Sequence, residues 1–216
     1  MPSDPFEMAI VHRAFRSELH NATGLVRRVT AGDTSRSAAV GGHIEFMMTA
    51  LHPHHLAEDA VVWPRLSARA PSRAAEVIRM EDAHRGIADT SGRVRATAAR
   101  WAESGDPWLA GQLVRLVEEL AVRVDEHLDD EKRNVVPLIA EYLSPREWRK
   151  CLAHASAFVR AHPKRGLALG GIVLAGESAE NRERFLGNVP LPVRTAYKIF
   201  GDRIYAGYRA QIYGSE

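Results

Sequence analysis

Apolar residues recur every three to four positions along most of the chain, the spacing of a helix with one buried face. Four long segments show this pattern, at about residues 4–31, 33–70, 72–104 and 106–142. Gly32, Pro71 and Gly105 separate them, and Asp106-Pro107 is a favourable helix start. No stretch alternates with period two for long enough to predict a sheet. We therefore expect an all-α fold, an up-down-up-down four-helix bundle.

The pattern continues beyond residue 143 in shorter pieces. Ser144-Pro145-Arg146-Glu147 has the spacing of a capping box and predicts a fifth helix to about residue 161. Further helical pieces are expected at 178–187 and 192–210, after a stretch of small apolar residues at Leu167–Ala175. We expect residues 1–143 to form the bundle. Residues 144–216 then form a C-terminal helical extension, which serves as a cap, a lid or a dimerisation element.

Histidine and glutamate interrupt the apolar stripes that should face the core. His54 and Glu58 are four residues apart, as are His127 and Glu131, so each pair shares one helix face. Another stripe histidine lies 42 or 43 residues upstream of each pair, at His12 and at His84. The chain therefore contains two copies of one unit, a helix with a histidine followed by a helix with His-x-x-x-Glu.

These residue types at core positions indicate a metal site. A buried carboxylate costs several kcal/mol unless it is paired or bound to metal. A purely structural core of His–Glu ion pairs is the alternative. Imidazole and carboxylate ligands without thiolate suit iron, manganese or zinc, and donors from four helices suit a two-metal centre. Glu58 and Glu131 can each bridge two metals, and so many histidines favour binding or reducing dioxygen over storing ferric mineral.

Composition excludes several other classes of protein. The single cysteine, Cys151, rules out a disulfide framework and a cysteine-based zinc site. With 29 Lys+Arg against 27 Asp+Glu and no basic run, no nucleic-acid partner is expected. The longest apolar stretch has nine residues, far short of a membrane span, and no targeting segment is visible. We expect a cytoplasmic protein with no membrane partner.

The doubled motif resembles that of hemerythrin and of the hemerythrin-like domains named for their His–His–Glu cation-binding motif. A proline follows each glutamate by six residues, at Pro64 and Pro137, and the resemblance covers about residues 5–142. It implies a four-helix bundle that holds two iron ions with five histidines and two carboxylates, manganese or zinc being substitutes. Six of these ligands fall on residues of the repeat: His12, His54, Glu58, His84, His127 and Glu131.

The seventh ligand departs from the pattern of circulating hemerythrins, whose third helix supplies two histidines four residues apart. Here the residues four from His84 are Met80 and Ala88, which cannot bind a metal. His55 lies about 100° around its helix from His54, so we expect it to reach the second metal beside His84. The hemerythrin-like domain of an iron-sensing F-box protein is similar, with a ligating glutamate directly after the corresponding histidine. The alternative is that His55 is solvated, or that it contacts a metal ligand without binding the metal itself.

These features predict a non-heme di-iron protein that binds dioxygen or peroxide, for oxygen binding, sensing or catalase-like peroxide handling. A di-iron oxygenase or oxidase is the main alternative, with an organic substrate held under the extension. Its pocket would open onto the metals and carry polar anchors such as His43. A regulatory protein that responds to iron and oxygen is a third hypothesis, and a homodimer through the extension is compatible with all three. The sequence assigns no catalytic residue and leaves open whether the protein is an enzyme.

Overall fold

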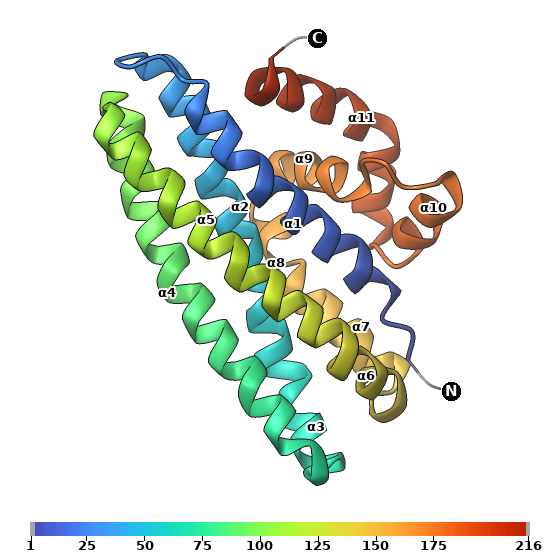
Figure 1. Ribbon diagram of the computed structural model, residues 1–216. Helices are drawn as coiled ribbons and strands as arrows, with labels where there is room; N and C mark the ends of the chain where they lie inside the picture. Colours follow the sequence, from blue (N-terminus) through green and yellow to red (C-terminus); the bar gives the residue numbers. More distant parts are fainter. Residues whose placement is uncertain (1–2, 215–216) are drawn as a thin grey trace.

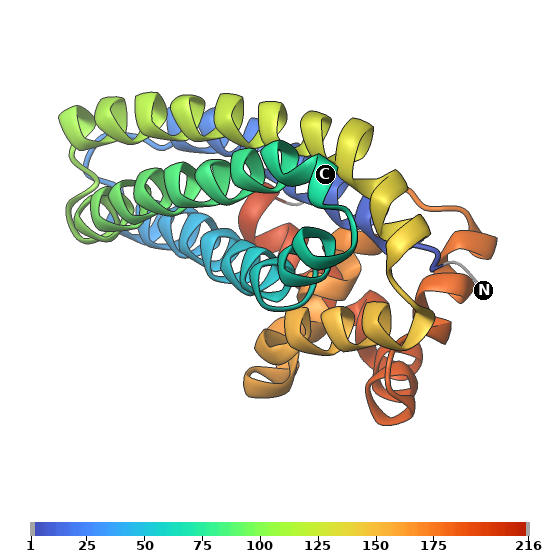
Figure 2. The ribbon, with the colours of Figure 1, turned by 90° about the horizontal axis from the view of Figure 1, so that it is seen from below.

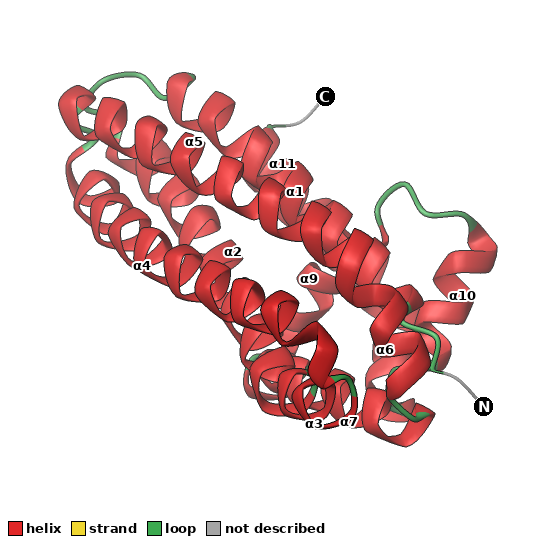
Figure 3. Ribbon diagram, turned by 60° about the horizontal axis from the view of Figure 1, so that its bottom comes forward, coloured by secondary structure: helices red, strands yellow, loops and turns green. Residues whose placement is uncertain are grey.

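The protein is helical throughout the part that the computed structural model describes, residues 3–214, and no strand occurs there (Figure 3). None of the described helices is long and apolar enough to cross a bilayer. In chain order the helical elements are α1 (Phe6–Arg27), α2 (Thr34–Val61), α3 (Trp63–Arg69), the short 3₁₀ turn η1 (Pro71–Arg73), α4 (Ala74–Ser104), α5 (Pro107–Asp130), the π-helical turn η2 (Glu131–Val135), α6 (Val136–Tyr142), α7 (Pro145–Ala155), α8 (Ala157–Ala161), α9 (Pro163–Leu174), α10 (Ala179–Gly187) and α11 (Leu191–Tyr213).

Helices α1, α2, α4 and α5 run alternately up and down and form the bundle, which confirms the predicted fold class (Figure 1). Local signals set their ends. The Asp33 carboxylate accepts a hydrogen bond from the Arg36 amide at 2.9 Å, and Asp106 accepts one from the Leu109 amide at 2.8 Å. Gly105 ends α4 with φ of 61°, a left-handed conformation that glycine adopts without steric cost.

The second and fourth predicted helices are each interrupted near the proline that follows the glutamate. Helix α2 ends at Val61, and α3 carries Pro64 in its first turn. In the second copy α5 passes through the π turn η2 into α6, which carries Pro137 in its first turn. Proline lacks an amide hydrogen and clashes with the preceding turn, which favours a break at both positions, although α2 itself continues through Pro53. The prediction of unbroken helices to residues 70 and 142 was wrong in this detail.

The helices after residue 144 lie on the α1 and α2 side of the bundle, away from α4 and α5 (Figure 2). The capping box forms as predicted, with Ser144 and Glu147 bonding each other's backbone amides. Helix α7 ends at Ala155, and a separate short helix, α8, follows it. Helix α9 was not predicted, because its three glycines make the sequence look irregular. Those glycines let α11 approach: a Cβ atom at Gly170 would lie 3.0 Å from the Tyr197 ring, and one at Gly171 would overlap Tyr205.

Several polar contacts fix this extension on the bundle. The Trp148 indole of α7 donates to the Glu7 carboxylate of α1 at 3.0 Å. Arg13 of α1 donates to the carbonyl oxygens of Val173 and Ala175 at 3.2 and 3.1 Å. These two residues flank Leu174, the last residue of α9. Donors from the bundle thus satisfy carbonyl groups that the end of a helix leaves without partners.

Two apolar clusters fill the bundle, one on each side of a polar layer. The larger cluster occupies most of its length and includes Phe15, Leu51, Ile87 and Val124. The smaller one lies toward the α3 and α6 end and includes Met8, Val61, Met80, Val135 and Trp148. On each of the four bundle helices, the histidine or His/Glu pair lies between a residue of one cluster and a residue of the other.

Candidate metal centre

The seven side chains that the sequence singled out lie together in this polar layer. Each bundle helix contributes at least one: His12 from α1, His54, His55 and Glu58 from α2, His84 from α4, and His127 with Glu131 from α5 and the start of η2. Six of the seven are buried and His54 is half-buried. The apolar clusters on both sides separate the layer from bulk water.

The donor atoms form two groups of four, each able to surround one metal ion. One group contains His55, Glu58, His84 and His127, and the other contains His12, His54, Glu58 and Glu131. Within each group the potential ligand atoms lie within 4.8 Å of one another. Glu58 belongs to both groups, one carboxylate oxygen facing each, which is the arrangement of a bridging carboxylate.

In the group that contains His12, the rings of His12 and His54 face each other across the α1–α2 interface. Their Nε2 atoms are 3.1 Å apart, His12 Nε2 is 3.4 Å from Glu131 Oε2, and His54 Nε2 is 3.3 Å from Glu58 Oε1. Ligands about 2.1 Å from one ion and at right angles to each other are about 3 Å apart. The observed separations are therefore those expected around a common ion.

The other group is built around three imidazole rings. His55 stacks on His84 with ring centroids 4.2 Å apart, and His127 meets both rings edge-on at 5.1 and 4.8 Å. His84 Nε2 lies 3.5 Å from Glu58 Oε2. The structure thus brings His55 to the position expected from its helical angle, beside His84 and His127 and away from the His12–His54 pair.

Many of these buried polar atoms have no hydrogen-bond partner among the described residues: His55 Nε2, His84 Nε2, both nitrogens of His127 and all four oxygens of Glu58 and Glu131. Unpartnered buried polar atoms are rare in proteins, because each one costs about 1–3 kcal/mol. Their concentration in one layer fits a set of ligands better than a self-sufficient polar core. The donor set of five imidazoles and two carboxylates suits iron, manganese or zinc.

Burial controls the charge of the cluster. It lowers the pKa of His54 to about 3 and holds the pKa values of His12, His55 and His127 well below 6.5, with the neighbouring histidines adding to the effect. These imidazoles are neutral at pH 7, the form that binds metals. Burial also raises the pKa of Glu131 to about 8, and that of Glu58 well above its usual range, so without a cation the pair retains protons. Metal binding must displace them.

Asp59 supports the cluster and was not found from the sequence. Its Oδ1 lies 2.7 Å from His84 Nδ1, which leaves Nε2 of the same ring directed at Glu58, and it also accepts a hydrogen bond from the Trp63 indole at 2.8 Å. Partial burial acts to raise the pKa of Asp59, but the hydrogen bond and charge of His84 outweigh it and lower the pKa. A carboxylate behind a metal-binding histidine fixes its tautomer and orientation. The spacing of four residues between Asp59 and Trp63 is the signal that could have revealed it.

The remaining histidines lie outside the cluster. His43 is buried and makes hydrogen-bonded contacts of its own, with Nδ1 2.7 Å from the Tyr208 hydroxyl and Nε2 3.0 Å from Glu18 Oε2. His20 lies at the surface, 2.8 Å from Asp125. The others are exposed: His52, His154 and His162.

The lone cysteine lies near the cluster without belonging to either group. Cys151 is buried on α7, in the same apolar cluster as Val61 and Met80. Burial raises the pKa of its thiol, and the charges of Glu58 and Glu131 raise it further. A thiol that stays protonated is a poor nucleophile and a poor ligand, so Cys151 packs as a small apolar residue.

Replacing His55 tests whether it is a ligand. We expect His55→Ala to lower the bound metal by about one ion per chain and to change the visible spectrum, because His55 supplies one of three imidazoles in its group. The control is His52→Ala, an exposed histidine three residues earlier on the same helix. Metal content and spectrum identical to those of the control would leave His55 as a packing residue beside His84.

Comparison with known proteins gave one match. A family model described as the hemerythrin HHE cation binding domain matches residues 7–139. No curated protein and no solved structure matched the chain. The matched segment begins in α1 and ends in α6, and it includes all seven side chains of the cluster.

Proposed function

The chain belongs to the hemerythrin HHE cation-binding family, and from this premise we propose that its His/Glu cluster holds two iron ions and binds dioxygen or peroxide. The shared position of Glu58 carries the proposal, because it joins two four-ligand groups into one two-metal centre. The proposed ligands are His12, His54, His55, Glu58, His84, His127 and Glu131. Manganese and zinc suit the same donors and are the competing metals.

The residues around the proposed irons have two roles: the ligands set the charge of the centre, and the apolar residues exclude water. Imidazole carries no charge as a metal ligand, so five imidazoles and two carboxylates would leave a pair of divalent cations with net positive charge, which favours a small anionic or electron-accepting guest. Two ferrous ions would supply the electrons that dioxygen or peroxide accepts. The apolar clusters on either side keep the surroundings dry, and Asp59 holds His84 in the orientation required.

The oxygenase alternative is less well supported. A pocket does lie between the bundle and the extension, and His43 lines it. However, none of the seven cluster residues is among those that line it. A substrate held there would not be in contact with the proposed irons, so we propose binding or handling of the oxygen species itself.

We further propose that residues 1–143 are the metal-binding unit and that residues 144–216 cap it. Trp148 and Cys151 of α7 belong to the apolar cluster beside the proposed irons, which supports a capping role. Exposed apolar residues on α11, Leu191, Ile199 and Phe200, are compatible with a homodimer through this extension. A regulatory role would require iron or oxygen to change how the extension packs.

The test is anaerobic loading of the whole chain with ferrous iron, followed by exposure to air. We expect about two irons per chain and a visible absorption band that appears with air. A band lost again when oxygen is removed indicates reversible binding, whereas decay accompanied by peroxide consumption indicates catalase-like turnover. Failure to retain iron, or iron whose spectrum and oxidation state do not respond to air or peroxide, would contradict the proposal.

A further inference from the structure

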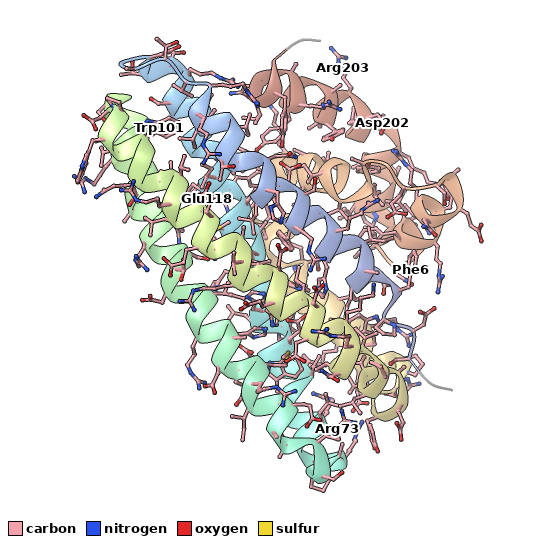
Figure 4. The ribbon with its side chains drawn as sticks, in the orientation of Figure 1. Phe6, Arg73, Trp101, Glu118, Asp202 and Arg203 are labelled. Carbon is pink, nitrogen blue, oxygen red and sulfur yellow. The ribbon has the colours of Figure 1, made fainter. Side chains whose placement is uncertain are left out.

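A pocket of about 710 Å³ lies where α2, α9 and α11 meet. This volume is within the range of about 300–1,000 Å³ typical of small-molecule sites. It is separate from the metal centre, because His43 on its wall precedes His54 by eleven residues of one helix, or about 16 Å. Figure 4 labels Arg203 of this region on α11, far from the α5 side of the bundle that Glu118 marks.

The charges on the pocket wall are all of one sign. Lys164, Arg165 and Arg203 line it, and no carboxylate is among the described residues that do so. The side chains of Lys164 and Arg203 have no hydrogen bond or ion pair with any residue between 3 and 214. Arg165 lies 3.9 Å from Glu45, beside the pocket, and over the Phe46 ring. The pocket therefore offers at least two uncommitted cations to a ligand.

Its remaining wall is largely apolar. Phe46, Ala168 and Ile212 are buried side chains that face the same space. The polar exceptions include Tyr208, whose hydroxyl is held by His43. The carboxylate of Glu18 does not line the pocket; it lies 3.0 Å from His43 Nε2 and accepts a hydrogen bond from the Tyr213 hydroxyl at 2.6 Å. A ligand complementary to this wall has an apolar body and a negative head.

Two helical glycines keep the pocket open. Gly42 of α2 and Gly207 of α11 both line it, and a Cβ atom added at either would meet nothing within 4 Å. Apart from proline, glycine is the least favourable residue in a helix interior. Close packing explains Gly171, which lies against Tyr205, but it does not explain these two. Their effect is to preserve empty space beside the cations.

We propose that this pocket binds an amphipathic anion, an aliphatic carboxylate whose chain lies against Phe46 and Ile212 and whose head is held by Lys164 and Arg203. Charge-assisted hydrogen bonds to the carboxylate supply selectivity, and burial of the chain supplies affinity. A purely polar anion would leave the apolar wall unused. An uncharged lipid would leave both cations unpaired.

Calorimetric titration of the full-length protein with octanoate, octanol and octylamine tests the chemistry of the ligand. We expect one octanoate per chain, octanol at least tenfold weaker and no binding of octylamine. Octanol that binds as tightly as octanoate, or no binding of octanoate at low millimolar concentration, would overturn the proposal. The measurement needs no iron, so its outcome is independent of that for the metal centre.

Substitutions test the location. Gly207→Leu places a side chain in the pocket and is expected to weaken octanoate binding at least tenfold. The control is Gly92→Leu, at another helical glycine where an added Cβ atom would meet nothing within 4 Å; it should leave the affinity unchanged. Lys164→Glu should weaken octanoate binding by a similar factor, and Lys150→Glu, at an exposed position on α7, is the matched control. Octanoate binding that survives Gly207→Leu but disappears with a chelator would place the carboxylate on a metal ion and refute the pocket.

Discussion

Glu58→Ala is expected to abolish binding of both metal ions while leaving the metal-free protein folded. Glu58 is the side chain common to the two groups of ligand atoms, so its loss removes a donor from each. Substitution of residues that merely support a ligand costs about 10–100-fold in affinity, and we expect more than about 100-fold here. Iron content after loading and gel filtration measures the effect.

Stability distinguishes loss of a ligand from loss of the fold. Both carboxylate oxygens of Glu58 are buried without a hydrogen-bond partner among the described residues. Removing unpartnered atoms, which cost about 1–3 kcal/mol each, offsets much of the cavity that alanine leaves. The free energy of unfolding of the metal-free variant should therefore stay within about 2 kcal/mol of the parent. Glu45→Ala, at a partly exposed position on the same helix, should change neither quantity. Full occupancy by two metals in Glu58→Ala would remove the basis of the two-metal centre.

The arrangement of the cluster could be predicted because helical periodicity fixes direction. His54 and Glu58 share a helix face with the apolar stripe, so they must point inward wherever that stripe does. The same argument placed His55 toward His84, and the two rings stack in the structure. The repeat further predicts which helices act together. Two equivalent units packed in one bundle place their polar residues at the same height along the bundle axis.

Features that depend on tertiary contact or on an exact backbone path could not be predicted. The π turn at Glu131 arises where a helix must accommodate Pro137 within a packed bundle, and such turns are frequent at functional sites. Asp59 resembles any half-exposed acidic residue until His84 of another helix is placed beside it. Helix α9 is rich in glycine and has weak intrinsic helix propensity, so only its packing against α11 explains why it forms.

The packing of α9 on α11 predicts a large effect on stability: Gly171→Ala should destabilise the protein, although alanine favours helices. A Cβ atom at Gly171 would overlap the Cβ atom of Tyr205, which the α11 backbone fixes, so rotation of the side chain cannot relieve the clash. Overpacking of this kind costs about 1–3 kcal/mol. At about 2–4 °C per kcal/mol for a chain of this size, thermal denaturation should show a clear fall in Tm.

In the matched control, the same substitution should change stability in the opposite direction. Gly92 lies in the middle of α4, where a Cβ atom meets nothing within 4 Å, so Gly92→Ala should stabilise the protein by about 0.5–1 kcal/mol. Tyr205→Gly combined with Gly171→Ala should cost less than the sum of the two single substitutions, because glycine removes the Cβ atom that the new methyl group would overlap. Iron content should be unchanged in all of these variants, since none of the three substituted residues belongs to the ligand groups. Equal Tm shifts for the two glycine variants would mean that α9 and α11 are not in close contact, and the wall of the anion pocket would then be lost with them.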